Sequence, residues 1–242
     1  MNAVRMPRRL VLVTSVVAAI ALSPVNSAWA EPVPNDLSFT AVPGVIAGTS
    51  PDGLGTWGVH YQRIGGGNPD TAAAINAGID AEAMGQVQHQ TWDASTRRPW
   101  TFDATGTAYF RRMTISELFV GQYNTDEPHM PMQLVASVVF DNRSGIRITL
   151  DNLFSDKSAG LTRLSEQTAA ILPTVYAQRH PGEWEPSAFA PIDINFKYWI
   201  PTGQGIELHF PDLQFGRGLK VITVPWAKVA DLIAPEFRPI MA

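Results

Sequence analysis

The sequence predicts an α+β fold with largely antiparallel sheets and two main helices. The chain has 19 glycines and 19 prolines among 242 residues, a content typical of many turns and short strands. Apolar segments of strand length outnumber the helical ones. Strand and helix segments do not alternate strictly, as they would in a parallel α/β sheet, so the pattern favours antiparallel pairing with helices packed against it.

Composition and charge narrow the functional class. Apolar residues make up 45% of the chain and charged residues 17%, which excludes a disordered protein and a coiled coil. Outside the first 30 residues, 15 basic side chains stand against 22 acidic ones, a formal charge of −7 that argues against nucleic acid or an anionic membrane as partner. Because the chain has no cysteine, a disulfide, a thiolate nucleophile, Cys-ligated zinc and a lipoprotein anchor are excluded.

Residues 1–30 have the pattern of a signal peptide. Three arginines precede an apolar run from Leu10 to Leu22, and the small residues Ala28 and Ala30 occupy positions −3 and −1 of a cleavage site. The alternative is an uncleaved membrane anchor, but the apolar run is shorter than the ~20 residues that a spanning helix needs. We therefore expect a secreted or cell-envelope protein whose mature chain begins at Glu31.

The first half of the mature chain is expected to contain one helix among several strands. Residues 39–47 and 56–64 are predicted strands on either side of a turn at 49–53. A helix is expected from Asp70, because apolar residues recur at spacings of three and four. That stripe consists of Ala72, Ile75, Ile79, Ala83 and Val87.

The following segments extend the same pattern. Residues 100–123 are predicted to form two adjoining strands and 132–141 another, with a turn at 142–145 into an extended segment at 146–150. A second helix is expected from about residue 158, kinked at Pro173 because proline removes an N–H and crowds the preceding turn. Its buried stripe is predicted to be Leu161, Leu164, Ile171, Leu172 and Val175.

The last quarter of the chain is expected to be strand-rich. A loop at 181–191 contains three prolines, residues 195–200 and 206–210 are predicted to form a hairpin, and 219–224 are predicted to be the last strand. A short helix is expected to begin at Pro225 and to end near residue 233.

Motifs for catalysis and metal binding are absent from the sequence. Neither of the serine-hydrolase motifs Gly-x-Ser-x-Gly and Ser-x-x-Lys occurs. Other catalytic triads are not excluded, because their geometry rather than their spacing in the sequence defines them. None of the five histidines lies in a metal-binding motif, so we expect no metal and no cofactor. His209 and His60 are predicted to face solvent, since they alternate with apolar neighbours along their strands.

Several short motifs carry a resemblance to a known family by their order along the chain. They lie at 61–66, 75–76, 140–141, 144–145, 148–154, 195–196, 205–210, 218–221 and 224–226. Together they span about residues 56–233 and resemble the RsiV-type group of bacterial extracytoplasmic domains. Its members include the sensor region of the anti-sigma factor RsiV, accessory domains of some peptidoglycan deacetylases, and a mycobacterial secreted immunogenic protein.

The resemblance implies a two-lobed α+β fold with a β-grasp-like second half. On this basis residues 31–112 are expected to form an N-terminal strand–helix lobe and residues 113–242 an RsiV-like C-terminal lobe. It also implies a non-catalytic protein of actinobacterial origin that binds an envelope or host protein and is antigenic. The alternatives are a small secreted envelope hydrolase, esterase-like with a non-standard serine site, and an inert wall component without a specific partner.

Two proline-containing loops are the predicted binding surface. Residues 125–131 depart from the family, many members of which have a Gly-Gly-x-His-Pro-type loop there, and residues 180–191 are expected to expose Trp184 between two acids. Proline limits the freedom of both loops and so lowers the entropic cost of binding. His129, Met130 and Trp184 are the expected binding residues, with a protein partner, no nucleic acid and no membrane insertion after signal cleavage.

Overall fold

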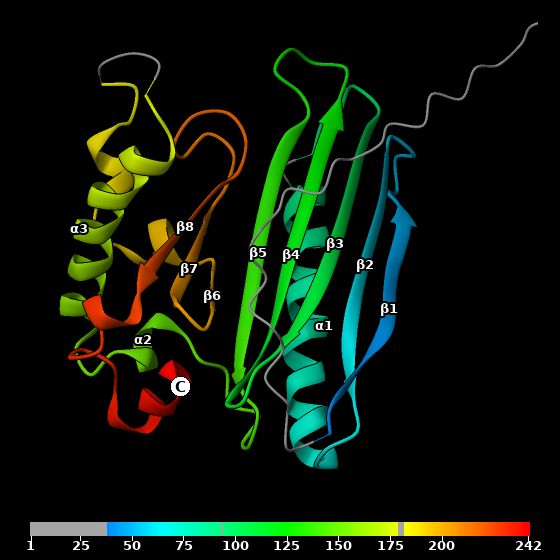
Figure 1. The fold of residues 1–242 in the computed structure, drawn as a ribbon. Helices are drawn as coiled ribbons and strands as arrows, with labels where there is room; N and C mark the ends of the chain where they lie inside the picture. Colours follow the sequence, from blue (N-terminus) through cyan, green and yellow to red (C-terminus); the bar gives the residue numbers. More distant parts are fainter. Residues whose placement is uncertain (1–37, 93, 179–181) are drawn as a thin grey trace, which may run out of the picture.

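The computed structural model describes residues 38–92, 94–178 and 182–242. The predicted signal peptide, its cleavage site at Ala30 and the Pro-rich segment after it lie outside the described residues. The α+β class is confirmed, with one five-stranded sheet and one three-stranded antiparallel sheet (Figure 1). No helix in the described part of the chain is long and apolar enough to cross a membrane.

The larger sheet contains five strands in sequence order. They are β1 (Thr40–Thr49), β2 (Gly55–Gly65), β3 (Trp100–Phe110), β4 (Thr114–Thr125) and β5 (Met132–Asp141). All neighbouring pairs are antiparallel except β2 and β3, which are parallel. Parallel neighbours need a long crossover, and the helix α1 (Pro69–Trp92) supplies it.

The large sheet continues past residue 112, where we expected the first lobe to end. β4 and β5 follow that position and are strands of the same sheet, burying Ile115, Phe119 and Phe140 in one core with α1. A boundary at 112 would cut the β3–β4 hairpin, so the division between the two parts of the molecule follows β5 instead.

α1 covers one face of the large sheet with the predicted stripe. All five residues are buried, and Asn68 caps the helix by accepting the N–H groups of Asp70 and Thr71, each at 3.0 Å. Gly78 lets the helix approach the sheet, because a Cβ there would lie 2.5 Å from the ring of Phe140. The helical periodicity of this segment therefore predicted both the element and its buried face.

The second part of the molecule contains a small sheet, one long helix and short helical turns. Its elements are α2 (Leu150–Leu153), α3 (Lys157–Val175), η1 (Pro186–Phe189), α4 (Asp193–Phe196), β6 (Trp199–Pro201), β7 (Gly205–Phe210), β8 (Lys220–Pro225), η2 (Trp226–Lys228) and η3 (Pro235–Met241). Figure 1 shows the small sheet beside β5 and α3 on its far side. A second apolar core fills the space between them.

Three local expectations for this part need correction. Residues 193–196 form a helical turn rather than a strand, because the amide of Asn195 donates to the carbonyls of Ser187 and Ala190 and holds the chain in a turn. Residues 146–149 form only a single bridge, between Arg147 and Phe140. Val175 is 56% exposed, because it lies at the end of α3 beyond the covered stripe.

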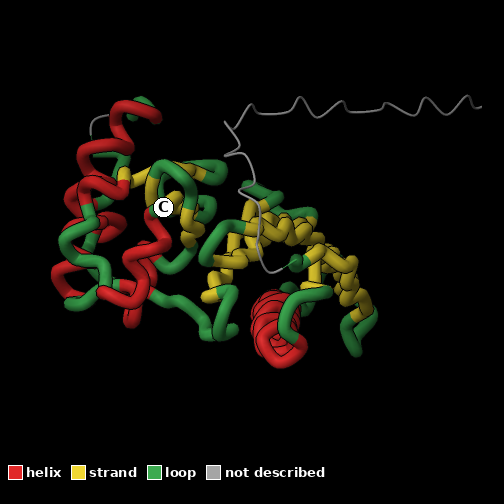
Figure 2. The backbone as a smooth tube through the Cα atoms, turned by 60° about the horizontal axis from the view of Figure 1, so that its bottom comes forward, coloured by secondary structure: helices red, strands yellow, loops and turns green. Residues whose placement is uncertain are grey.

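The two sheets meet along a seam at β5. Leu118 and Val135 of the large sheet pack against Ile200 of β6. Ser137 of β5 donates to the carbonyl of Trp199 at 2.9 Å and accepts its N–H at 2.8 Å, so side-chain bonds replace backbone pairing at this edge. Figure 2 shows the small sheet and its helices beside one side of the strand layer, with α1 on another face. The edge at β5 is thus covered.

Candidate functional site

Two loops from the two sheets meet at the upper end of the molecule in Figure 1. Residues 126–131 connect β4 to β5 and residues 211–219 connect β7 to β8; we call these two loops together the loop junction. Its centre is Asp212, whose side chain is 1% exposed. The carboxylate accepts the N–H of Gly218 at 2.6 Å and of Gln133 at 3.3 Å, and pairs with Arg217 at 3.2 Å.

Further bonds tie the loops to each other. Arg217 donates to the carbonyl of Pro131 at 3.1 Å, and the side chain of Gln133 accepts the N–H of Leu219 at 3.1 Å. The N–H of Asp212 donates to the carbonyl of Gln133 at 3.3 Å. These bonds hold both loops in one arrangement, so little further ordering would be needed for the loops to act as a binding surface.

Two exposed side chains of the loop junction have strained backbone. His129 has φ of 69° and Leu213 has φ of 77°, both in the left-handed region that favours glycine. Such a conformation costs about 1 kcal/mol or more for a residue with a Cβ, and strained residues cluster at functional sites. Leu213 is also 56% exposed, so burial does not explain its apolar side chain.

Two of the predicted binding residues lie in the loop junction. His129 and Met130 were predicted as binding residues, and the structure places His129 in the open and Met130 half-buried in the same loop. Leu213 and Arg217 were missed. The available signal was Gly216 and Gly218, whose positive φ values of 84° and 80° build the tight loop around them.

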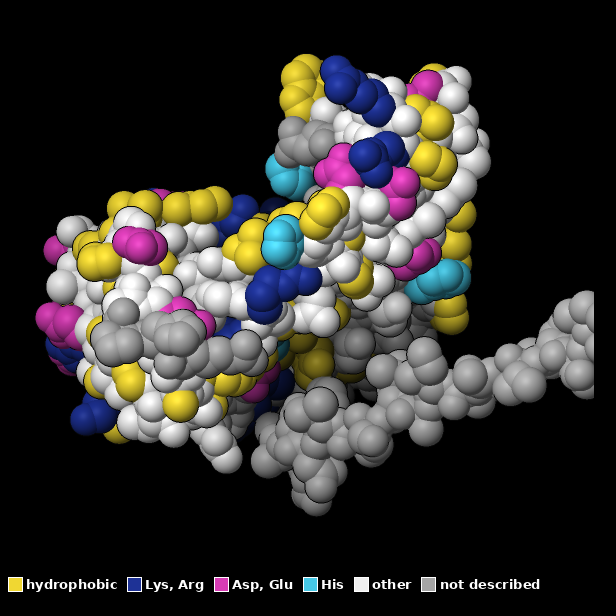
Figure 3. Space-filling model, turned by 90° about the horizontal axis from the view of Figure 1, so that it is seen from above, with side chains coloured by type: hydrophobic (Ala, Val, Ile, Leu, Met, Phe, Trp, Pro, Cys, Tyr) yellow, Lys and Arg dark blue, Asp and Glu magenta, His cyan; other side chains and the backbone are white. Residues whose placement is uncertain are grey.

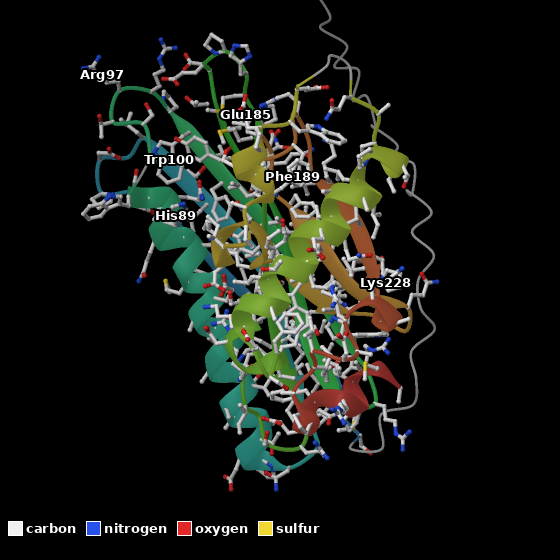
Figure 4. All side chains as sticks on the ribbon, turned by 90° about the vertical axis from the view of Figure 1, so that its left-hand side faces the viewer. His89, Arg97, Trp100, Glu185, Phe189 and Lys228 are labelled. Carbon is white, nitrogen blue, oxygen red and sulfur yellow. The ribbon has the colours of Figure 1, made fainter. Side chains whose placement is uncertain are left out.

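Trp184 does not lie on the surface, so that expectation is wrong. It is 7% exposed and packs in the second core, with its ring centroid 6.3 Å from Phe189 and 6.0 Å from Phe215. Figure 4 shows Phe189 beneath the exposed Glu185. Burial of the large apolar surface of the indole stabilises the fold, and the acidic neighbours in the sequence do not prevent it. His180, in the same predicted loop, lies outside the described residues.

His209 is also buried, contrary to the prediction that it faces solvent. Its side chain is 8% exposed, and its Nε2 lies 2.9 Å from Oε1 of Glu207. These two residues project from the face of β7 opposite its apolar core, and the large sheet covers that face at the seam. His60 is exposed as predicted, because no element among the described residues covers its side chain on β2. Alternation predicted the face of each residue but not what covers it.

A hollow of about 330 Å³ lies at the seam between β5 and the segment 147–151. Two of its lining residues, Asp151 and Asp193, are joined through Lys157 at 2.5 Å each. These hydrogen bonds raise the pKa of Lys157. Lys157 of α3 thus pairs with acids of α2 and α4, so these charges join three elements of the fold. The described residues contain no group of three side chains suited to holding a metal ion.

Glu117 is a fully buried acid in the core under α1. Its Oε1 accepts the N–H of Gln62 at 2.8 Å, and its Oε2 is buried without a partner among the described residues. The carboxyl extends past Gly106 of β3, where a Cβ would lie 2.2 Å from Oε1. Burial raises the pKa of Glu117 to about 8, and the bond from Gln62 opposes that rise.

The geometry defines a two-sheet α+β protein whose ordered loops share one end. No family model and no curated relative matches the sequence. The similar solved structures include a member of the DUF3298 family from Bacteroides fragilis, with TM-score 0.51, 10% identity and coverage of 86% of this chain and 96% of that one. They also include a DUF3298 family protein from Pseudomonas aeruginosa, with TM-score 0.49, 9% identity and coverage of 83% of this chain and 96% of that one.

The likeness to the Bacteroides structure concerns the fold alone, given the low identity. This likeness agrees with the α+β fold that the resemblance implied, and membership of the RsiV-type group stays a prediction.

Proposed function

We propose that this chain is a secreted or cell-envelope protein that binds a protein of envelope or host origin through the loop junction, without catalysing a reaction. The observation that carries the proposal is the pair of strained, exposed residues His129 and Leu213 on loops ordered by the buried Asp212. Folding alone would favour glycine at both positions. Export, supported by the pattern of residues 1–30, would bring this surface into contact with such partners.

The chemistry of the loop junction suits a protein surface. Leu213 offers an apolar contact, His129 a ring that donates and accepts, and Arg217, half-exposed, a planar cation. Figure 3 views this end from above and shows apolar, basic and histidine side chains close together beside a hollow between the two parts of the molecule. Mixed side chains of this kind on a rigid base are typical of protein interfaces.

The test begins with a cross-linking amino acid placed at position 129 or 213, followed by purification of the protein captured. Binding of that purified partner is then measured for the double variant His129→Ala/Leu213→Ala. Truncated anchors typically cost roughly 1–4 kcal/mol each, so we expect the Kd to rise at least about tenfold. Both residues are exposed, so the variant should retain its fold.

Ile146→Ala is the matched control. This side chain is 58% exposed and follows β5, at the opposite end of that strand from the loop junction. Binding that is unchanged in the double variant, or weakened equally by the control, would contradict the proposal. Turnover of a short-chain ester by the purified protein, lost on serine-directed inactivation, would favour the hydrolase instead.

A further inference from the structure

β1 is an open edge of the large sheet. It pairs with β2 on one side, and no other strand among the described residues pairs with it. Figure 1 shows it as the outermost strand, on the far side from the small sheet. Exposed edge strands are ordinarily protected by charge, by proline, by a bulge or by a cover, because their free N–H and C=O groups bind other strands. The one proline of β1 is Pro43, near its start. β1 has ten residues without one charge and pairs with β2 in unbroken register.

The register shows which backbone groups of β1 are free. The N–H of Ser50 donates to the carbonyl of Gly55 at 2.9 Å, so this residue directs its backbone toward β2. Direction alternates along a strand, and the pairing continues without a bulge. The odd-numbered residues therefore direct their N–H and C=O outward. Val45, Ala47 and Thr49 are among those whose N–H and C=O both lack a partner within residues 38–92, 94–178 and 182–242.

Two prolines lie near the ends of this outward edge, Pro43 within β1 and Pro51 in the turn that follows it. Pro43 and Pro51 each lie four residues from Ala47, and neither has an N–H to offer. Pairing of β1 with a second β1, antiparallel and centred on Ala47, would place Pro43 of one chain opposite Pro51 of the other. Val45 would then pair with Thr49, and Ala47 with its own copy. No N–H or C=O between the prolines would lack a partner.

The two faces of β1 also fit such a pairing. Toward the α1 side, rings from β2 cover the glycines of β1: a Cβ at Gly44 would lie 2.8 Å from the ring of Tyr61, and one at Gly48 2.7 Å from that of Trp57. On the other face, Val45 is 57% exposed. The β-branched Val45 would meet the β-branched Thr49 of the second copy, a favourable cross-strand pair.

We propose that the protein forms a two-fold symmetric dimer through β1, which joins the two five-stranded sheets into one continuous sheet. A second copy fits better than a strand of another protein, because only self-pairing uses the equal spacing of both prolines from Ala47. The absence of charge matters as well, since identical strands would place like charges opposite each other. This inference is independent of the proposed function, which concerns the opposite edge of the large sheet.

Sedimentation velocity of the purified protein over a concentration series tests the proposal. We expect a dimer at high concentration. Ala47→Lys and Ala47→Glu place two like charges across the symmetry axis, so each variant alone should have a dissociation constant several-fold above that of the unsubstituted protein. An equal mixture of these two variants should recover the dimer, because opposite charges then meet.

A second pair of variants tests the backbone contact. Val45→Pro removes an outward N–H from each chain without removing a bond to β2, and should weaken the dimer at least about tenfold. Val45→Thr keeps the N–H and a β-branched side chain, so it should dimerise normally. A monomer at every concentration, a dimer unaffected by both charge variants, or a mixture that stays monomeric would each overturn the proposal.

Discussion

Replacing the buried Glu117 by glutamine should flatten the pH dependence of stability. The carboxyl is fully buried, and within the described part of the chain it accepts one hydrogen bond, from the N–H of Gln62. A glutamine side chain at this position would not ionise. It has nearly the same size as glutamate, and its amide oxygen could still accept that N–H. The substitution Glu117→Gln therefore removes a titration from the core and leaves the packing close to unchanged.

The magnitude follows from the pKa of the folded protein. Glu117 has a folded pKa of about 8 against an ordinary value of 4.5, so between these values the folded state holds a proton that the unfolded chain has released. Where the folded state binds more protons, stability falls as pH rises. The slope is ~1.4 kcal/mol per pH unit, which amounts to roughly 3 kcal/mol lost by pH 7 relative to acid conditions.

Urea unfolding followed by tryptophan fluorescence measures this directly. Free energies of unfolding are compared for the unsubstituted protein and Glu117→Gln at several values between about pH 5 and pH 8. As the pH rises, the free energy of unfolding of the variant should increase relative to that of the unsubstituted protein by ~1.4 kcal/mol for each pH unit. Glu185→Gln is the control, since Glu185 is exposed and its replacement should leave the profile unchanged.

The test depends on how the difference in free energy of unfolding between the two proteins changes with pH. The size of that difference at one pH does not decide it. The amide of the variant could cost a constant amount because Oε2 of Glu117 has no partner among the described residues. A difference between the two proteins that stays the same from about pH 5 to pH 8 would show that Glu117 ionises in the folded state as it does in the unfolded one. Burial would then not hold a proton on Glu117 in the folded state.

The remaining predictions concern stability and are measured by urea unfolding at one pH. Gly106→Ala should destabilise by about 1–3 kcal/mol, because the new Cβ would lie 2.2 Å from Glu117. Trp184→Ala should cost about 3–5 kcal/mol as a core truncation, and a loss under about 1 kcal/mol would contradict its burial. Asp212→Ala should cost about 1–3 kcal/mol by leaving buried N–H groups unpaired. Leu213→Gly should stabilise the protein by about 1 kcal/mol, because glycine adopts the positive φ at this position without strain.

The local elements were predictable where one periodicity dominated. The stripe of α1 is buried as predicted, and β5 has the predicted bounds, Met132–Asp141. The parallel pairing of β2 and β3 was not predicted, because it depends on how α1 returns the chain to the sheet. The lobe boundary at 112 failed for a related reason: hairpin pairing joins β4 to β3, and no break in composition marks that continuity.

The candidate site was only half predictable, for reasons of tertiary packing. His129 lies in a loop and could be found from composition. Trp184 and His209 have polar sequence neighbours but are covered by parts of the chain distant in sequence. The positive φ of Leu213 was not predicted, since it arises from the turn that brings Asp212 beneath the loops. Burial by another element is the information that a local pattern lacks.

The two edges of the large sheet differ in how they are covered. At β5, side chains of Ser137 and Asp212 bond to backbone groups, so this edge is closed by the small sheet. At β1, the described chain supplies neither a cover nor a charge, and only Pro43 interrupts the outward N–H groups. Covering one edge positions the strained loops beside the seam, while the other edge stays free to pair. A dimer through β1 would thus carry its two loop junctions at a distance from the symmetry axis, where both could engage a partner.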